Sequence, residues 1–275
     1  CERNGMLVMD EAFDCWEKPK NTNDYHSYFN EWAQRDIQTM VDRDKNSPSV
    51  IIWSIGNEIE EVFTDNSKGV EIAKKLKDWV EEIDKTRPIT NGVATWAGVR
   101  NITNEINDLM DVQGYNYGEY EYSKAHLKYP DWCIYGSETA SAFYSRGIYH
   151  RDTIDKGNVK IHDDKQSSCY GTEYAFNTAE NALKTVRDND YVSGEFVWTG
   201  FDYGGEPTPY PSSKSSYFGI VDTAGFEKDP YYLYKSMWTD EDVVHLVPQN
   251  WNYTIGETIP VIVYTNAAKV ELFLN

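Results

Sequence analysis

The chain has 275 residues, a length that suits one large domain or one domain with part of another. It carries 26 Lys and Arg residues against 45 Asp and Glu residues, a formal net charge of −19. Such a charge repels phosphate backbones and anionic lipid surfaces, and the sequence contains neither a basic patch nor an apolar run near 18 residues, so nucleic acids and membranes are poor candidate partners.

The first residues, CERNGMLVMDEAFD, contain no cationic start and no apolar signal core. They have the pattern of a helix end closed by Gly5 and followed by a buried strand. We therefore expect the chain to begin inside its fold. Its compartment stays open, whether cytoplasmic, periplasmic or secreted.

Short apolar runs alternate with amphipathic segments over most of the chain. They predict strands over residues 6–10, 50–55, 89–93, 112–115, 133–135 and 195–198, and helices over residues 25–42, 70–84, 120–128 and 175–188. Strands that are apolar on both faces and separated by helices belong to a parallel sheet covered on both sides, which is either doubly wound or a barrel.

The pattern changes after residue 200. Residues 203–229 are rich in Gly, Pro and Ser and have no period, which predicts a long loop of the kind that often carries function. A last helix is expected over residues 230–238. The β-branched runs VVHLVP, TIPVIVYT and KVELFLN then indicate antiparallel strands, so we expect a second, all-β domain to begin near residue 240.

Two strand ends carry a glutamate. The run IIWSIGNEIE places Asn57 and Glu58 after a buried strand, and WCIYGSETAS places Glu138 after another. In a parallel barrel such residues point into the catalytic mouth, although Asn57 and Glu58 would also suit a helix cap. The 80 residues between the glutamates, at about 27 per strand and helix, fit strands three positions apart that face each other. Retaining glycoside hydrolysis needs two such carboxylates.

Three further strand ends offer binding groups. Nine Trp and 21 Tyr residues are more than packing alone usually requires, and amphipathic rings line sugar-binding clefts, although an aromatic-rich core would also explain them. Trp198 could stack on a sugar ring or fill the core. Asp10 and Glu11 could bind sugar hydroxyls or pair with cations. The segment DVQGYNYGEY contributes three more residues, namely Tyr115, Asn116 and Tyr117.

These motifs together resemble the catalytic domain of glycoside hydrolase family 2, most closely the bacterial β-galactosidases. The resemblance rests on VMDEAFD, IIWSIGNE, GYNYGEY, YGSETAS, GEFVWTGFDYGGEPTPY and KSSYFGIVDTAGFEKDPYYLYKSMW. It implies that Glu58 is the general acid/base and Glu138 the nucleophile. It also implies that Asn57 binds the 2-hydroxyl, that Tyr117 orients Glu138, with Tyr115 as the alternative, and that Trp198 forms the floor of the sugar site.

Some features depart from the family pattern. Some β-galactosidases bind magnesium through a glutamate and a histidine shortly after the DEA strand, but the stretch here is FDCWE, so we predict no metal and no other cofactor. A histidine that some members carry three residues after the nucleophile is Ser141 here. No Asn-x-Lys pair of the β-glucuronidases occurs between Asp202 and Asp229. The four cysteines lack the spacing of a zinc site or a dense disulfide framework.

The expected fold is α/β, a (β/α)8 TIM barrel without its first two strands over residues 1–239, followed by the start of a β-sandwich over residues 240–275. The expected activity is hydrolysis of terminal β-D-galactosides, with little turnover from the isolated chain because a barrel wall would be absent. The alternatives are a β-glucuronidase, a β-mannosidase, an enzyme for a decorated glycan, a glycan-binding remnant and a structural domain. The expected partner is a carbohydrate, and self-association stays open.

Overall fold

The computed structural model describes residues 1–94, 105–149, 178–206, 210, 213–250 and 253–274. It divides into two compact units, one comprising Cys1–Glu138 and Val186–Glu195 and the other Thr139–Thr185 and Phe196–Asn275. The expected domain boundary after residue 239 does not follow this division and stays a prediction.

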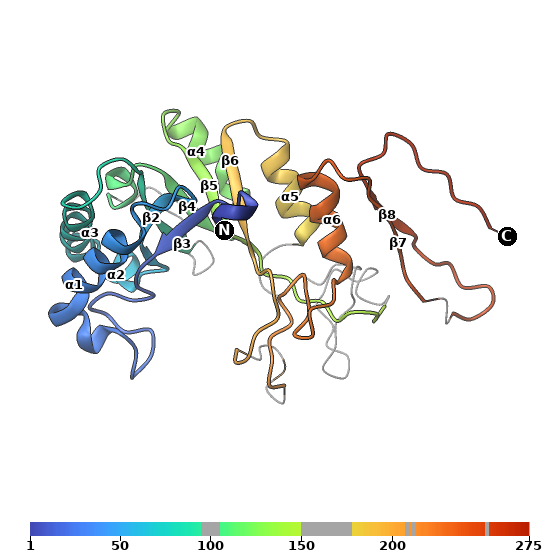
Figure 1. Cartoon of the computed structure of the whole chain (residues 1–275), viewed down its shortest axis with the longest axis horizontal. Helices are drawn as coiled ribbons and strands as arrows, with labels where there is room; N and C mark the ends of the chain where they lie inside the picture. Colours follow the sequence, from blue (N-terminus) through green and yellow to red (C-terminus); the bar gives the residue numbers. More distant parts are fainter. Residues whose placement is uncertain (95–104, 150–177, 207–209, 211–212, 251–252, 275) are drawn as a thin grey trace. The chain divides into compact units, whose positions relative to one another are not determined.

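A six-stranded sheet runs through the chain in sequence order, β1 to β6 (Figure 1). Its first five strands pair in parallel, each with the next. Sequential parallel strands separated by helices are the order of a TIM barrel, so the predicted fold class is confirmed. The strands are β1 (Val8–Glu11), β2 (Val50–Asn57), β3 (Ile89–Ala94), β4 (Gln113–Asn116), β5 (Ile134–Ala140) and β6 (Val192–Trp198).

The main core of the first unit lies between β2 and the helices that cover it. Helix α1 (His26–Asp44) buries residues four apart, which places them on one face, and α3 (Asn66–Glu81) packs beside it (Figure 1). These faces close over Trp53 of β2, which is fully buried. The short helix α2 (Glu60–Thr64) precedes α3, whose start is capped by Asp65 through its contact with the Lys68 N–H.

Smaller elements complete this unit. The predicted helix end at Gly5 is the 3-10 helix η1 (Glu2–Asn4), with Gly5 in the left-handed conformation at φ 67°. Two further 3-10 turns, η2 (Asn107–Leu109) and η3 (Glu119–Glu121), flank β4. Helix α4 (Tyr122–Lys128) packs its Tyr122 into a second core cluster with Tyr115 of β4.

The second unit holds α6 (Asp229–Trp238), most of α5 (Ala179–Arg187), and a two-stranded antiparallel sheet of β7 (Val244–Val247) and β8 (Ile262–Thr265). Tyr144, Leu183 and Tyr234 form its core. The antiparallel pattern expected after residue 240 is therefore present. The last apolar run, described as far as residue 274, forms no strand there.

Several element bounds differ from those that the sequence predicts. Strand β5 was expected over 133–135 but continues to Ala140, because pairing with β4 carries its small and polar residues into the sheet. Helix α2 was not predicted. Cys169, residues 175–177 of a predicted helix and residues 207–209 and 211–212 of the predicted loop lie outside the described residues.

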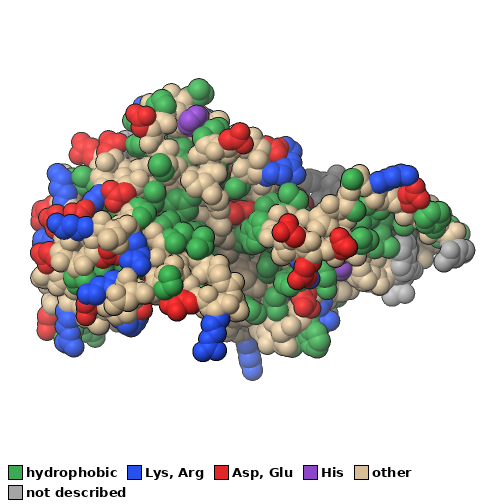
Figure 2. Space-filling model, turned by 45° about the horizontal axis from the view of Figure 1, so that its top comes forward, with side chains coloured by type: hydrophobic (Ala, Val, Ile, Leu, Met, Phe, Trp, Pro, Cys, Tyr) green, Lys and Arg blue, Asp and Glu red, His purple; other side chains and the backbone are tan. Residues whose placement is uncertain are grey.

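Figure 2 shows acidic and basic side chains interspersed over the face in view. In the described part of the chain many charged side chains pair, as Lys77 does with Asp111 at 2.6 Å. Among the helices of the described ranges, none combines the length and the apolar character that crossing a bilayer requires.

Candidate active site

The backbone at the end of β2 is held from both sides. The Asn57 N–H donates to the Phe13 carbonyl at 3.0 Å, and the Glu58 N–H donates to the Gly92 carbonyl of β3 at 2.8 Å. Glu58 has a φ of 48°, a left-handed conformation that costs a non-glycine residue on the order of 1 to 3 kcal/mol. Such a conformation persists where the neighbouring structure fixes it, and it is frequent at functional sites.

Glu138 of β5 contacts the residues that end β4. The Tyr117 N–H donates to the Glu138 carbonyl at 2.7 Å, and the Tyr117 hydroxyl donates to Glu138 Oε1. Tyr117 also has a left-handed backbone, with a φ of 54°. The contact that the sequence resemblance implies between this tyrosine and Glu138 is thus present in the structure.

Tyr115, the alternative to Tyr117, lies on the other face of the strand. It is fully buried and packs edge to face against Tyr122 of α4, with ring centroids 5.7 Å apart. Strand residues alternate between faces, so Tyr115 belongs to the layer between β4 and α4. The structure places Tyr117, rather than Tyr115, against Glu138.

The side chain of Asn116 joins the two glutamates. Its Nδ2 lies 2.8 Å from Asn57 Oδ1, 3.1 Å from Glu58 Oε1 and 3.5 Å from Glu138 Oε2. Its Oδ1 accepts a hydrogen bond from the Ser137 hydroxyl at 2.6 Å. Because an ionised carboxylate only accepts hydrogen bonds, its contacts place the NH2 end of the Asn116 amide, rather than the oxygen, toward the two glutamates.

The shared nitrogen limits the spacing of the two carboxylates. Glu58 Oε1 and Glu138 Oε2 cannot be further apart than the sum of their distances to Asn116 Nδ2, which is 6.6 Å. Retaining glycosidases hold their carboxyl groups about 5 to 5.5 Å apart, and inverting ones about 6.5 to 9.5 Å. This upper limit therefore allows every carboxyl separation of the retaining enzymes and only just reaches the shortest separation of the inverting enzymes.

Gly92 lies under these side chains. A Cβ atom at this position would lie 2.9 Å from Asn116 Oδ1 and 3.1 Å from Asn57 Oδ1. A glycine inside a strand often marks such a close approach, so Gly92 is the sequence signal for this contact.

Glu11 of β1 also faces this group. Its Oε2 accepts a hydrogen bond from Ser54 of β2 at 2.6 Å. Burial raises the pKa of Glu11, and the negative charges of Asp14 and Glu58 add to the rise, whereas Ser54 and Lys20 oppose it. The electrostatic influence of Glu58 on Glu11 agrees with their placement at the ends of paired strands.

Two charged residues that sequence analysis did not single out touch Asn57. The Asn57 Nδ2 donates to Asp14 Oδ1 at 3.0 Å, and the Lys20 Nζ donates to the Asn57 carbonyl at 2.9 Å. Lys20 and Asp14 are themselves an ion pair at 2.8 Å. Both lie in the irregular segment after β1, where no periodicity marks a contact with another strand.

Asp10 projects to the opposite face from Glu11, as strand alternation requires. It interacts with Asp44 at the end of α1, and Arg43 lies 3.8 Å from its carboxylate. Burial and the neighbouring Asp44 raise the pKa of Asp10 to about 6. The sequence left open whether Asp10 binds sugar hydroxyls or pairs with cations, and that choice stays a prediction; in the structure its neighbours are Asp44 and Arg43.

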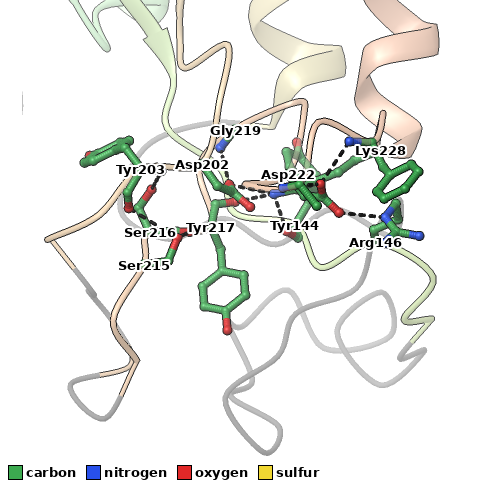
Figure 3. Close-up of polar contacts among 12 residues, drawn as sticks. Tyr144, Arg146, Asp202, Tyr203, Ser215, Ser216, Tyr217, Gly219, Asp222 and Lys228 are labelled. Carbon is green, nitrogen blue, oxygen red and sulfur yellow. Dashed lines mark hydrogen bonds and ion pairs between the residues drawn. The ribbon is translucent and has the colours of Figure 1, made fainter.

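Trp198 ends β6 and belongs to the second unit. Its ring meets that of Tyr203 edge to face at 5.8 Å, beside a cluster of Phe143, Tyr210 and Phe218. The loop that follows β6 is tied by reciprocal contacts between Tyr203 and Ser216 (Figure 3). The stacking of Trp198 on a sugar ring stays a prediction, and the alternative is that Trp198 fills this cluster.

No cluster of three or more His, Cys, Asp or Glu side chains suited to a metal ion occurs among the described residues. The chemistry of the described group is instead that of carboxylates held by amides, a hydroxyl and a phenol. Two carboxylates of this spacing can act as a proton donor and a nucleophile.

Comparison with known proteins identifies the family of the chain. The family model described as "Glycosyl hydrolases family 2, TIM barrel domain" matches residues 1–239. The chain belongs to glycoside hydrolase family 2.

Its similarity extends to several named family members. The chain is 42% identical over its whole length to beta-galactosidase BoGH2A of Bacteroides ovatus, of which it covers 37%. It is 32% identical, again over its whole length, to a putative beta-glucuronidase of Formosa agariphila, of which it covers 28%. The chain thus spans about a third of the length of these relatives.

A solved structure shows the same fold. The crystal structure of a beta-glycosidase from Bacteroides vulgatus matches 94% of this chain and 35% of its own, at 32% sequence identity and a TM-score of 0.76. A beta-glucuronidase structure from Bacteroides uniformis matches 90% of the chain with a TM-score of 0.66, and at 22% identity this supports the fold alone.

Proposed function

We propose that this chain carries the catalytic centre of a retaining β-galactosidase, in which Glu58 is the general acid/base and Glu138 the nucleophile. The observation that carries the proposal is the single Asn116 nitrogen that lies within 3.5 Å of both carboxylates. It limits the separation of Glu58 Oε1 and Glu138 Oε2 to at most 6.6 Å, and this limit includes the spacing that a double displacement needs.

The reaction proceeds in two balanced steps. Glu138 attacks the anomeric carbon while Glu58 gives its proton to the departing glycosidic oxygen, so one carbon–oxygen bond forms as the other breaks. Glu58, now ionised, then takes a proton from water, whose oxygen displaces Glu138 from the same carbon. Two inversions give net retention.

The neighbouring groups have defined tasks in this scheme. The Tyr117 phenol donates to Glu138 Oε1, which fixes the rotation of the nucleophile. Asn116 supplies a second donor near both carboxylates. Asn57 would bind the sugar 2-hydroxyl and Trp198 would stack on the ring, both by resemblance to the family.

The galactoside assignment has two supports. The first is that BoGH2A, which is 42% identical to the chain, is named a beta-galactosidase, whereas the relative named a putative beta-glucuronidase is less similar, at 32% identity. The loop between Asp202 and Asp229 contains no asparagine, so it lacks the Asn-x-Lys pair of β-glucuronidases. β-Glucuronidase and β-mannosidase activities remain the alternatives to be tested.

The natural full-length protein should be assayed with aryl β-galactoside, β-glucuronide and β-mannoside. We expect the galactoside to have the highest kcat/KM, and the first sugar released, followed by NMR, to be the β-anomer. Release of the α-anomer would overturn the retaining mechanism, and a preference for another glycone would overturn the substrate. Binding of galactosides without turnover would favour a glycan-binding remnant.

Variants separate the roles of the two glutamates. Glu138→Gln should leave almost no turnover, because the amide is a poor nucleophile. Glu58→Gln should retain more activity on substrates with good leaving groups, which need little proton donation. Glu71→Gln on the exposed surface of α3 is the matched control and should be unchanged. Full activity in both active-site variants would place the site elsewhere.

A further inference from the structure

Two charged side chains outside the catalytic pair hold Asn57. Asp14 accepts from the Asn57 amide at 3.0 Å, and Lys20 donates both to Asp14 at 2.8 Å and to the Asn57 carbonyl at 2.9 Å. Side chain and backbone of Asn57 are therefore bound by the same ion pair. On the other side, the Asn57 Oδ1 accepts from Asn116.

These contacts determine how the Asn57 amide is presented. A side-chain amide has two N–H donors and a carbonyl oxygen with two lone pairs. Asp14 takes one donor and Asn116 takes one lone pair, so the amide cannot flip without losing both contacts. The contacts among the described residues leave one N–H and one lone pair of Asn57 for a ligand, in a fixed direction.

The segment that carries the ion pair is anchored independently of Asn57. The Lys18 N–H donates to the fully buried carboxylate of Glu61 at 2.7 Å. The Asp24 carboxylate accepts from the N–H groups of Lys20 and Asn21 at 2.8 and 2.7 Å. Lys20 therefore lies between two fixed points of the backbone.

Exposure differs between the two partners. The Lys20 side chain is 19% exposed and the Asp14 side chain is 68% exposed. A freely exposed pair is usually worth little because its side chains must be ordered. Here the ammonium is largely covered and has two acceptors, so its position depends less on Asp14 alone.

We propose that Asp14 and Lys20 are positioning residues that aim the remaining Asn57 N–H at the 2-hydroxyl of the sugar, and so make the enzyme selective for glycosides that carry this hydroxyl. The inference rests on the proposed function of the same site. Contacts to the 2-hydroxyl strengthen in the transition state of glycoside hydrolysis, so loss of aim lowers kcat as well as kcat/KM.

The test compares two substrates in the natural full-length protein, an aryl β-galactoside and its 2-deoxy analogue. Asp14→Ala and Lys20→Met should lower kcat/KM for the galactoside by roughly ten- to a hundredfold, the usual effect of a misplaced binding group. On the 2-deoxy substrate, which lacks the hydroxyl, the same variants should stay within about threefold of the unsubstituted protein. Lys20→Arg should recover part of the loss.

Lys18→Met is the matched control. Its ammonium donates to the Thr64 hydroxyl at 2.8 Å, and the variant keeps the backbone N–H that binds Glu61. We expect its kinetics on both substrates to match those of the unsubstituted protein. Should Lys20→Met fold poorly, as judged by circular dichroism, the more exposed Asp14→Ala still decides the question.

The outcomes separate the two proposals. Equal losses on both substrates, or no loss on the galactoside, would overturn the positioning role and leave the proposed function standing. An unsubstituted protein that hydrolyses no β-galactoside would overturn the proposed function, and the positioning role with it.

Discussion

The buried lysine of the second unit is a sensitive point of the fold. Lys228 is 1% exposed, and its Nζ donates to Asp202 at 2.7 Å and to the carbonyls of Tyr144 and Tyr217 at 2.8 and 3.2 Å (Figure 3). Three segments of the unit therefore meet at one ammonium group. We predict that Lys228→Met destabilises the protein strongly.

The magnitude follows from what the substitution leaves behind. The Asp202 side chain is 6% exposed, and the Gly219 N–H at 2.8 Å is a single neutral donor. Removing one partner of a buried ion pair typically costs about 3 to 5 kcal/mol, because the remaining charge is buried without compensation. Methionine keeps most of the apolar stem, so little of this cost comes from lost packing.

The pH dependence has a defined sign. Burial raises the pKa of Asp202, and Lys228 opposes this rise. Without Lys228 the pKa of Asp202 should rise further above that of the unfolded chain. The folded state then binds more protons than the unfolded state, so the variant should lose stability as pH rises through the folded pKa.

Urea unfolding of the natural full-length protein, followed by circular dichroism, measures this cost. Lys235→Met is the control, since Lys235 pairs with Glu241 on the surface, and such pairs are worth about 0 to 1 kcal/mol. Combining Lys228→Met with Asp202→Asn should recover part of the stability by removing the stranded charge. A loss below about 1 kcal/mol for Lys228→Met, or no recovery in the double variant, would refute the reasoning.

Three further outcomes are expected. Asp10→Asn should raise the free energy of unfolding by about 1 to 3 kcal/mol at pH 7 and hardly at pH 3, because the pKa of Asp10 is raised to about 6 and its ionised form destabilises the fold. Urea unfolding at both pH values measures the gain, and an equal gain at pH 7 and pH 3 would contradict this prediction. Tyr117→Phe should lower kcat roughly tenfold or more with a small change in KM, since it frees the rotation of Glu138, and steady-state kinetics with an unchanged kcat would contradict that role. Trp198→Ala should raise KM and lower kcat without unfolding, whereas loss of the circular dichroism signal would show that Trp198 fills the core instead.

Much of the parallel sheet could be predicted from the sequence. Its strands are short apolar runs bounded by polar residues, and the order β1 to β6 follows from the alternation with helices. The bounds of β5 could not be predicted in this way. Residues 136–139 are small or polar, and only pairing with β4, where Asn116 lies opposite Glu138, makes them strand.

The candidate site was predictable to the extent that it depends on strand ends. Glu58 and Glu138 follow apolar strands, and the parallel sheet brings such ends to one edge. The contacts of Asp14 and Lys20 were not predictable, because they depend on the path of an irregular segment. Which of Asp10 and Glu11 faces the site depends on the register of β1 in the sheet, and a shift of the register by one residue would exchange the faces of the two side chains.

The left-handed residues explain why neighbouring side chains can act together. In a regular strand, Asn116 and Tyr117 would point to opposite faces, and Tyr117 would lie among the helices. The φ of 54° at Tyr117 breaks this alternation at the strand end, so its phenol reaches Glu138 while Asn116 contacts the same carboxylate. Glu58, with a φ of 48°, follows Asn57 in the same manner. Glycine would adopt either conformation without strain but has no side chain for the site, so the fold must supply the contacts that hold a tyrosine and a glutamate there.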